Sequence, residues 1–319
     1  MRVFLATILT VTTSLEIAGD QMRSTNITAQ STTIVDCDST TSTVTSKDGT
    51  TIGYRQLGRG PGLVILHGTA ESSHSHIDLA EALADTYTVY LPDRRGRGLS
   101  GTYGLGYGVA TEVEDLDAIL TKTGARFVFG VSVGAIVSLQ AARRLSAIDK
   151  LAIFEPPFIL NGSPSTAFLA RYDREIAEGN LPAALVTAMK GSEMGPAFFR
   201  AMPHWLMVPL TKHMIAREDR NARGGDVTMR MLAPTLHYDF QLIRESEGPL
   251  DRFEDIRAGL LLLGGTKSPA YCQASVEALS RVFPRARRAT LRGLGHEASG
   301  NVNQWGKPEQ IARELRRFF

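Results

Sequence analysis

The segment Gly130-Val131-Ser132-Val133-Gly134 links a short apolar run at 127–131 to a helix pattern at 135–145. A glycine on either side of Ser132 lets the strand and helix backbones approach each other at a sharp turn. Such a turn lifts the serine hydroxyl clear of the edge of a sheet. The strand before the turn and the helix after it distinguish this motif from a chance match to G-x-S-x-G.

Apolar runs and helix patterns alternate on both sides of this turn. The pattern predicts a hairpin at 43–55, strands at 63–66, 87–91, 127–131 and 151–154, and helices at 75–84, 110–121 and 135–145. The order resumes with strands at 260–263 and 288–291 and helices at 270–282 and 308–319. Wholly apolar strands joined by helices predict an α/β fold with a doubly wound, mostly parallel sheet.

From 158 to 249 the alternation stops, and the chain is helical in character and broken by Gly and Pro. We predict that this segment is a helical cap, inserted between core segments 43–157 and 250–319. It holds seven of the nine methionines, which are either packing between helices or a pliable apolar lining for a hydrophobic substrate. The expected substrate-binding residues, three of them in this segment, are His74, Trp205, Met207 and Tyr238.

Residues 1–19 resemble a secretory signal peptide, with one positive charge, a short apolar stretch and small residues before the expected cleavage site. The protein is secreted if this segment is removed on export and cytoplasmic if translation begins at Met22; the sequence leaves both open. Residues 20–42 are rich in Ser and Thr and predict a flexible arm.

The composition, with 43% hydrophobic and 21% charged residues and a formal net charge of +2, is that of a soluble globular protein. The basic residues are scattered among acidic ones, so no nucleic-acid partner is expected. The first apolar run is too short for stable membrane insertion. Neither Cys37 nor Cys272 stands in a zinc-site spacing or a nucleophile motif. The oligomeric state is not indicated.

Two further elements surround the turn serine. Gly293-Leu294-Gly295-His296 follows the last strand, and a histidine on such a loop can reach back to act as a general base. The backbone amides of Thr69, after the strand at 63–66, and of Val133, after the serine, are the expected oxyanion donors. His67 is expected to bond the loop rather than to take part in chemistry.

The acid that should orient His296 is not in the usual place, because Gly264-Gly265-Thr266-Lys267-Ser268-Pro269 contains no carboxylate. One strand earlier, Glu155 ends an apolar run and is followed by two prolines. A carboxylate there is costly to bury without a partner, so Glu155 is the expected acid. Asp239 is the reserve candidate.

From about residue 43 to 319 the chain resembles the α/β-hydrolase superfamily. Asp93-Arg94-Arg95-Gly96-Arg97-Gly98-Leu99-Ser100 resembles that family's loop after the fourth strand, and Phe154-Glu155-Pro156-Pro157 resembles a motif of small capped hydrolases. An acid after this strand also occurs in some haloalkane dehalogenases and in fungal resorcylic-lactone hydrolases. The turn carries a serine instead of an aspartate, which counts against dehalogenase and epoxide hydrolase chemistry.

Together these features predict a serine hydrolase that cleaves a carboxylic ester or lactone of a hydrophobic small molecule. The residues expected to carry the reaction are Ser132, His296 and Glu155. Cleavage of a C–C bond or cofactor-free perhydrolysis on the same residues, and a non-catalytic ligand-binding module of this fold, are the alternatives. No organic cofactor is implied. The pair His74 and His76 lacks the carboxylate or thiol cluster that a metal site requires, so no metal is expected.

Overall fold

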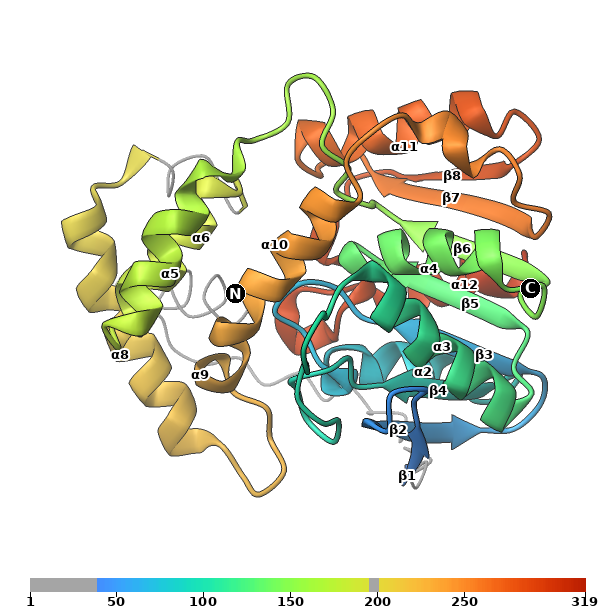
Figure 1. Ribbon diagram of the computed structural model, residues 1–319, viewed down its shortest axis with the longest axis horizontal. Coiled ribbons are helices and arrows are strands. Elements are labelled where there is room, and N and C mark those ends of the chain that lie inside the picture. Colours follow the sequence, from blue (N-terminus) through green and yellow to red (C-terminus); the bar gives the residue numbers. More distant parts are fainter. Residues whose placement is uncertain (1–38, 195–200) are drawn as a thin grey trace, which may run out of the picture.

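The structure is a computed structural model that describes residues 39–194 and 201–319. Its centre is an eight-stranded sheet in the order β1-β2-β4-β3-β5-β6-β7-β8 (Figure 1). The strands are Thr40–Thr45 (β1), Thr51–Gly58 (β2), Gly62–Leu66 (β3), Thr88–Pro92 (β4), Phe127–Val131 (β5), Lys150–Phe154 (β6), Gly259–Gly265 (β7) and Arg287–Leu291 (β8). β1 and β2 are antiparallel to their neighbours and the pairs from β4 to β8 are parallel. This confirms the predicted doubly wound, mostly parallel sheet.

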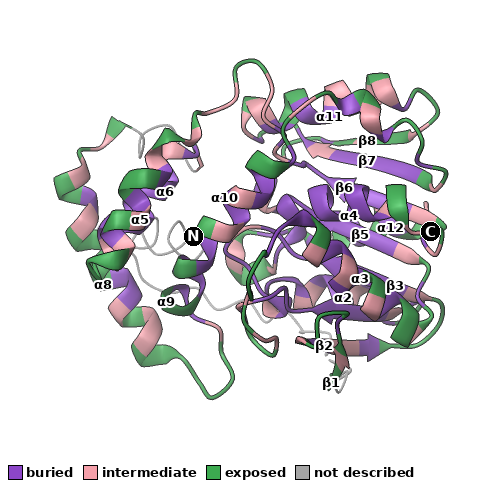
Figure 2. Cartoon of the chain, viewed as in Figure 1, coloured by how far each residue is buried: buried purple, intermediate pink, exposed green. Residues whose placement is uncertain are grey.

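The strands around the turn serine are covered on both faces. In β3, β5 and β6 every residue after the first is buried, which an apolar strand requires when helices pack on either side (Figure 2). One face carries α3, α4 and α11, and the other carries α2 and α12. These helices are Ile77–Leu83 (α2), Val109–Thr123 (α3), Val133–Arg144 (α4), Ala270–Val282 (α11) and Pro308–Arg316 (α12).

The segment between β6 and β7 is helical and stands beyond the carboxyl ends of the parallel strands (Figure 1). We call it the insert. Its helices are Leu169–Ala177 (α5), Leu181–Gly191 (α6), His204–Asn221 (α8), Met229–Leu232 (α9) and Leu236–Glu245 (α10). Helix α10 packs against α4, while α8 lies at the outer end, away from the sheet. The insert therefore faces the edge of the sheet at which Ser132 stands.

Several boundaries differ from those predicted. β1 begins at Thr40, so the arm predicted for 20–42 is three residues too long at its end. The rest of that arm, apart from residue 39, and the candidate signal peptide at 1–19 lie outside the described residues. The helix predicted at 75–84 is a 3-10 turn, Ser73–His76, followed by α2. Among the described helices, none combines the length and apolar character needed to cross a membrane.

Candidate active site

Ser132 stands in the turn between β5 and α4, with φ 53° and ψ −120°. A positive φ is strained for a serine, and it persists because the surrounding backbone leaves little alternative. A Cβ on Gly134 would lie 2.2 Å from the carbonyl oxygen of Leu66, and one on Gly130 would lie 2.7 Å from the carbonyl oxygen of Gly134. The amide of Ser132 donates to the carbonyl oxygen of Phe154 at 2.9 Å. Glycine is thus required on both sides of the serine.

Glu155 and His296 meet at the same edge of the sheet. Nδ1 of His296 lies 2.6 Å from Oε2 of Glu155, and the amide of Gly265 donates to Oε1 at 2.6 Å. Glu155 has no exposed surface, so both of its oxygens need these partners. The bond to the carboxylate places a proton on Nδ1 and leaves Nε2 of His296 as the nitrogen that can take up a proton.

Cys272, in the first turn of α11, lies beside the same histidine. Its Sγ is 3.9 Å from Nδ1 of His296, although the sequence showed no nucleophile motif around this cysteine. Burial lowers the pKa of His296, but Cys272 and the bond to Glu155 raise it, and the net pKa lies above the ordinary value. Glu155, Cys272 and His296 offer ligand atoms within 4.8 Å of one another, a set that could hold a metal ion.

The loop after β3 lies directly against the serine. A Cβ on Gly68 would come within 2.9 Å of Cβ of Ser132, so this backbone approach also needs glycine. Thr69 lines the cavity described below, and Val133 is the first residue of α4, where helix amides have no partner within the helix. Both expected oxyanion donors therefore belong to segments that adjoin Ser132.

His67 holds this loop in place, as the sequence predicted. Its Nε2 accepts from the amide of Arg94 at 3.1 Å, so Nδ1 carries the proton that is donated to the carbonyl oxygen of Gly68 at 3.0 Å. Burial, with the nearby charges of Arg97 and Arg94, holds the pKa of His67 well below its ordinary value. His67 is thus a neutral, structural histidine.

A second buried pair, Glu71 and His76, holds the loop after β3. Oε2 of Glu71 accepts from the amide of Gly68 at 2.8 Å and lies 3.1 Å from Nε2 of His76. Nδ1 of His76 in turn donates to the carbonyl oxygen of Ser299 at 2.8 Å. His76 therefore ties the loop after β3 to the segment that follows His296.

Asp239, the reserve candidate for the acid, is engaged elsewhere. Its Oδ1 accepts from Arg94 at 2.9 Å and from Arg97 at 2.8 Å, and its Oδ2 accepts from the amide of Ala70 at 3.1 Å. Asp239 is fully buried, and within the described residues its hydrogen bonds are to these two arginines and to Ala70, not to His296. Asp239 instead joins α10 of the insert to the loop after β3.

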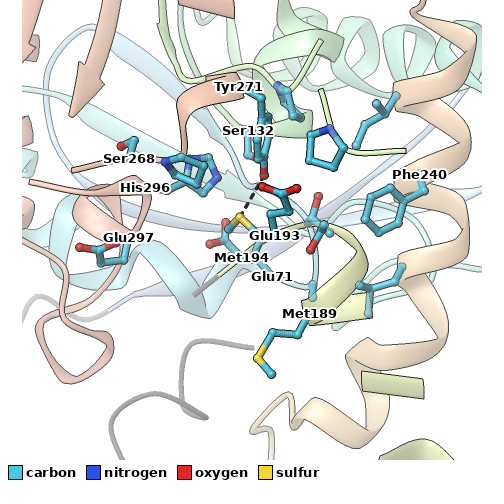
Figure 3. A pocket seen from close by; sticks show the side chains of 18 of the residues that line it. Glu71, Ser132, Met189, Glu193, Met194, Phe240, Ser268, Tyr271, His296 and Glu297 are labelled. Atoms are coloured by element: carbon cyan, nitrogen blue, oxygen red, sulfur yellow. Dashed lines mark hydrogen bonds between the residues drawn. The ribbon is translucent and has the colours of Figure 1, made fainter. Parts of the chain in front are cut away.

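A cavity of about 720 Å³ opens between the sheet edge and the insert. Ser132 and His296 line it from the core (Figure 3). Its wall on the insert side is largely apolar and includes Phe168, Met189, Leu232, Phe240 and Ile243. A cavity of this size and character suits a small molecule with a hydrophobic body.

Only one of the four expected substrate-binding residues lines this cavity. His74 does so. Trp205 is 74% exposed at the surface of α8, and Met207 is buried against Val186 and Met189. Tyr238 stacks on Tyr103 with ring centroids 3.5 Å apart. The expectations for Trp205, Met207 and Tyr238 are corrected, because helix packing turns these side chains away from the cavity.

Several residues that line the cavity were not predicted from the sequence, among them Glu71, Glu218 and Tyr271. Glu71 lies only three residues after Gly68, in the loop already assigned to the oxyanion donors, and that proximity was the available signal. Glu218 belongs to the insert, whose sequence pattern does not reveal which faces turn inward. Tyr271 and Cys272 begin a helix directly after β7, so their place at the sheet edge followed from the topology.

The mostly parallel sheet and the strained turn that carries Ser132 define the class of α/β hydrolases. The chain belongs to the alpha/beta hydrolase family, whose model matches residues 63–314.

Two of the similar proteins match most of the chain, and a third matches about a third of it. An α/β hydrolase from Sphaerobacter thermophilus has a similar structure, with a TM-score of 0.70 and 33% sequence identity over 87% of this chain and 100% of that chain. The pimeloyl-acyl-carrier-protein methyl ester esterase of Xanthomonas campestris is 25% identical over 82% of this chain and 96% of that protein. The uncharacterized hydrolase YraK of Bacillus subtilis is 34% identical over 116 residues, which span 35% of this chain and 43% of that protein.

Proposed function

We propose that this protein is a serine hydrolase that cleaves a carboxylic ester or lactone of a hydrophobic small molecule. Ser132 is the nucleophile, His296 the general base and Glu155 the acid that orients the base. The observation that carries the proposal is the bond of 2.6 Å between His296 and the buried Glu155, in a histidine that lines the same cavity as Ser132.

In the proposed reaction, Nε2 of His296 removes the proton of the Ser132 hydroxyl as its oxygen attacks the scissile carbonyl carbon. The backbone amides of Thr69 and Val133 donate to the oxyanion of the tetrahedral intermediate. His296 then gives the proton to the leaving alcohol. Water repeats the sequence on the acyl-enzyme and releases the carboxylic acid. Glu155 stabilises the imidazolium that forms in each half of the reaction.

The apolar wall of the insert supports a hydrophobic substrate. Phe168, Phe240 and Ile243 offer surface on which an alkyl or aromatic body is removed from water, at about 25 cal/mol for each Å² buried. In this proposal the insert acts as a cap over Ser132. The family relationship to an esterase of Xanthomonas campestris favours ester bonds.

The test is hydrolysis of a panel of linear esters and lactones by the wild type and by Ser132→Ala. We expect Ser132→Ala to lower kcat by about ten-thousand-fold or more, because the nucleophile acts as a unit with its base. Loss of labelling by a fluorophosphonate probe in the same variant should accompany the loss of turnover.

The panel also decides between the proposal and the alternatives. Turnover of short p-nitrophenyl esters by Ser132→Ala at the wild-type rate would remove Ser132 from the reaction. A wild type that is labelled at Ser132 but hydrolyses no member of the panel would instead point to C–C bond cleavage, perhydrolysis or a binding role.

A further inference from the structure

A carboxylate of the insert lines the same cavity as the nucleophile. Helix α8 is the outermost helix of the insert (Figure 1). Glu218 stands near its end and lines the same cavity as Ser132. The cavity wall around it is apolar, since Val227, Met229 and Leu232 line the cavity from the segment that follows α8. A substrate that fills the cavity can therefore contact both Ser132 and Glu218.

Within the described residues, one of the two carboxylate oxygens of Glu218 accepts a hydrogen bond. Its Oε2 accepts from the amide of Met229 at 3.1 Å. Within residues 39–194 and 201–319, Oε1 has no hydrogen-bond partner and no cationic side chain forms an ion pair with this carboxylate. Burial is the largest cause that raises the pKa of Glu218 above its ordinary value. A carboxylate against an apolar wall is costly unless a donor or a cation completes it.

The charged groups of the cavity have the opposite sign to the whole chain. The chain has a formal net charge of +2, yet its cavity is lined by Glu71, Glu193, Glu218 and Glu297 and by one lysine, Lys267. Lys267 is exposed, and Glu71 is already engaged with Gly68 and His76. This arrangement disfavours an anionic substrate. Among these acids, Glu218 is the one on α8, followed in the chain by the apolar cavity residues Val227, Met229 and Leu232.

We propose that Glu218 binds a protonated amine of the substrate, which makes the substrate an ester or lactone with an ammonium group beyond an apolar segment. This inference rests on the proposed function of Ser132. The ammonium group donates to Oε1 of Glu218 while the apolar segment contacts the insert, and the scissile carbonyl is then held at Ser132. Glu218 is a binding residue in this scheme and takes no part in bond cleavage.

The test compares methyl ω-aminoalkanoates of increasing length with methyl alkanoates in which a methyl group replaces the amino group. The wild type should hydrolyse the amino ester of one optimal length with a kcat/KM about ten- to one-hundred-fold above that of its neutral partner, as expected of a charge-assisted hydrogen bond. Glu218→Gln, which can still accept from Met229, should lose this preference, with kcat/KM falling about ten- to one-hundred-fold more for the amino ester than for its neutral partner. Acetate esters of ω-amino alcohols tell whether the amine belongs to the acyl or the alcohol part.

Glu178→Gln is the matched control, because it removes the same charge from an exposed position on the insert that does not line the cavity. It should retain the preference for amino esters. Glu218→Asp keeps the charge on a shorter side chain and should move the optimum to a longer substrate. Equal activity of the wild type on amino and neutral esters in both series, or a preference that survives in Glu218→Gln, overturns the inference and leaves the proposed function standing. If the wild type hydrolyses neither amino nor neutral esters, the result counts against the proposed function as well as the inference about Glu218.

Discussion

Glu155 and His296 are joined by a hydrogen bond of 2.6 Å although 141 residues separate them in the chain. The carboxylate follows β6, while the more usual position, after β7, is occupied by Thr266-Lys267-Ser268-Pro269, which include no carboxylate. β6 and β7 are neighbours in the sheet, so the shift displaces the acid by one strand spacing, roughly 5 Å. The hydrogen bond from the Gly265 amide to Oε1 holds the Glu155 carboxylate against the end of β7.

The first prediction ranks two buried acids. Glu155→Gln should lower kcat by roughly a hundred- to ten-thousand-fold, because His296 loses the carboxylate that orients it and stabilises its charged form. Asp239→Asn should cost less than about tenfold in the folded protein, since its contacts are with arginines and a loop amide and not with the base. Steady-state kinetics on a short ester decide the order, and the reverse ranking would reassign the acid.

The second prediction concerns pH. The proposed base, His296, can accept a proton only when neutral, and Cys272 and Glu155 raise its pKa against the effect of burial. Activity should therefore fall as the pH drops through this raised pKa. Glu155→Gln removes a negative charge beside the imidazole, so its lower activity should persist to a more acidic pH than that of the wild type. The profile of log kcat/KM against pH for both proteins measures the shift. Acidic limbs that coincide would mean that Glu155 does not raise the pKa of His296.

Features that depend on neighbouring residues in the chain were predicted correctly, and features that depend on packing between distant segments were not. The glycines around Ser132 and the apolar strands follow from neighbouring residues, so the turn and the sheet could be predicted. Trp205 and Met207 lie two residues apart in α8, about 200° apart around the helix, so one faces solvent and the other the interior. Sequence alone does not show which face of an inserted helix meets the cavity. Composition and hydrophobic spacing do not predict how the helices of the insert pack against one another.

The third prediction tests the link between the insert and the loop after β3. Asp239→Ala leaves Arg97 without its acid and releases the amide of Ala70, next to Thr69. The free energy of unfolding should fall by about 3–5 kcal/mol, the usual cost of removing one partner of a buried ion pair. Urea denaturation measures this change. Asp149→Asn breaks an exposed pair with Arg126 and should leave the midpoint nearly unchanged; equal effects of the two variants would contradict the buried link.

The fourth prediction separates cavity residues from surface residues of the insert. Phe240 lines the cavity, so Phe240→Leu should enlarge the space beyond Ser132 and move the preferred acyl chain towards a longer or bulkier group, by roughly tenfold in relative kcat/KM. Trp205→Ala is the control, because that side chain is 74% exposed and should leave the preference unchanged. Competition between esters of different acyl length measures both variants in one assay. If Trp205→Ala alone altered the preference, the substrate would be bound on the outer face of α8 and the apolar wall would have no part in specificity.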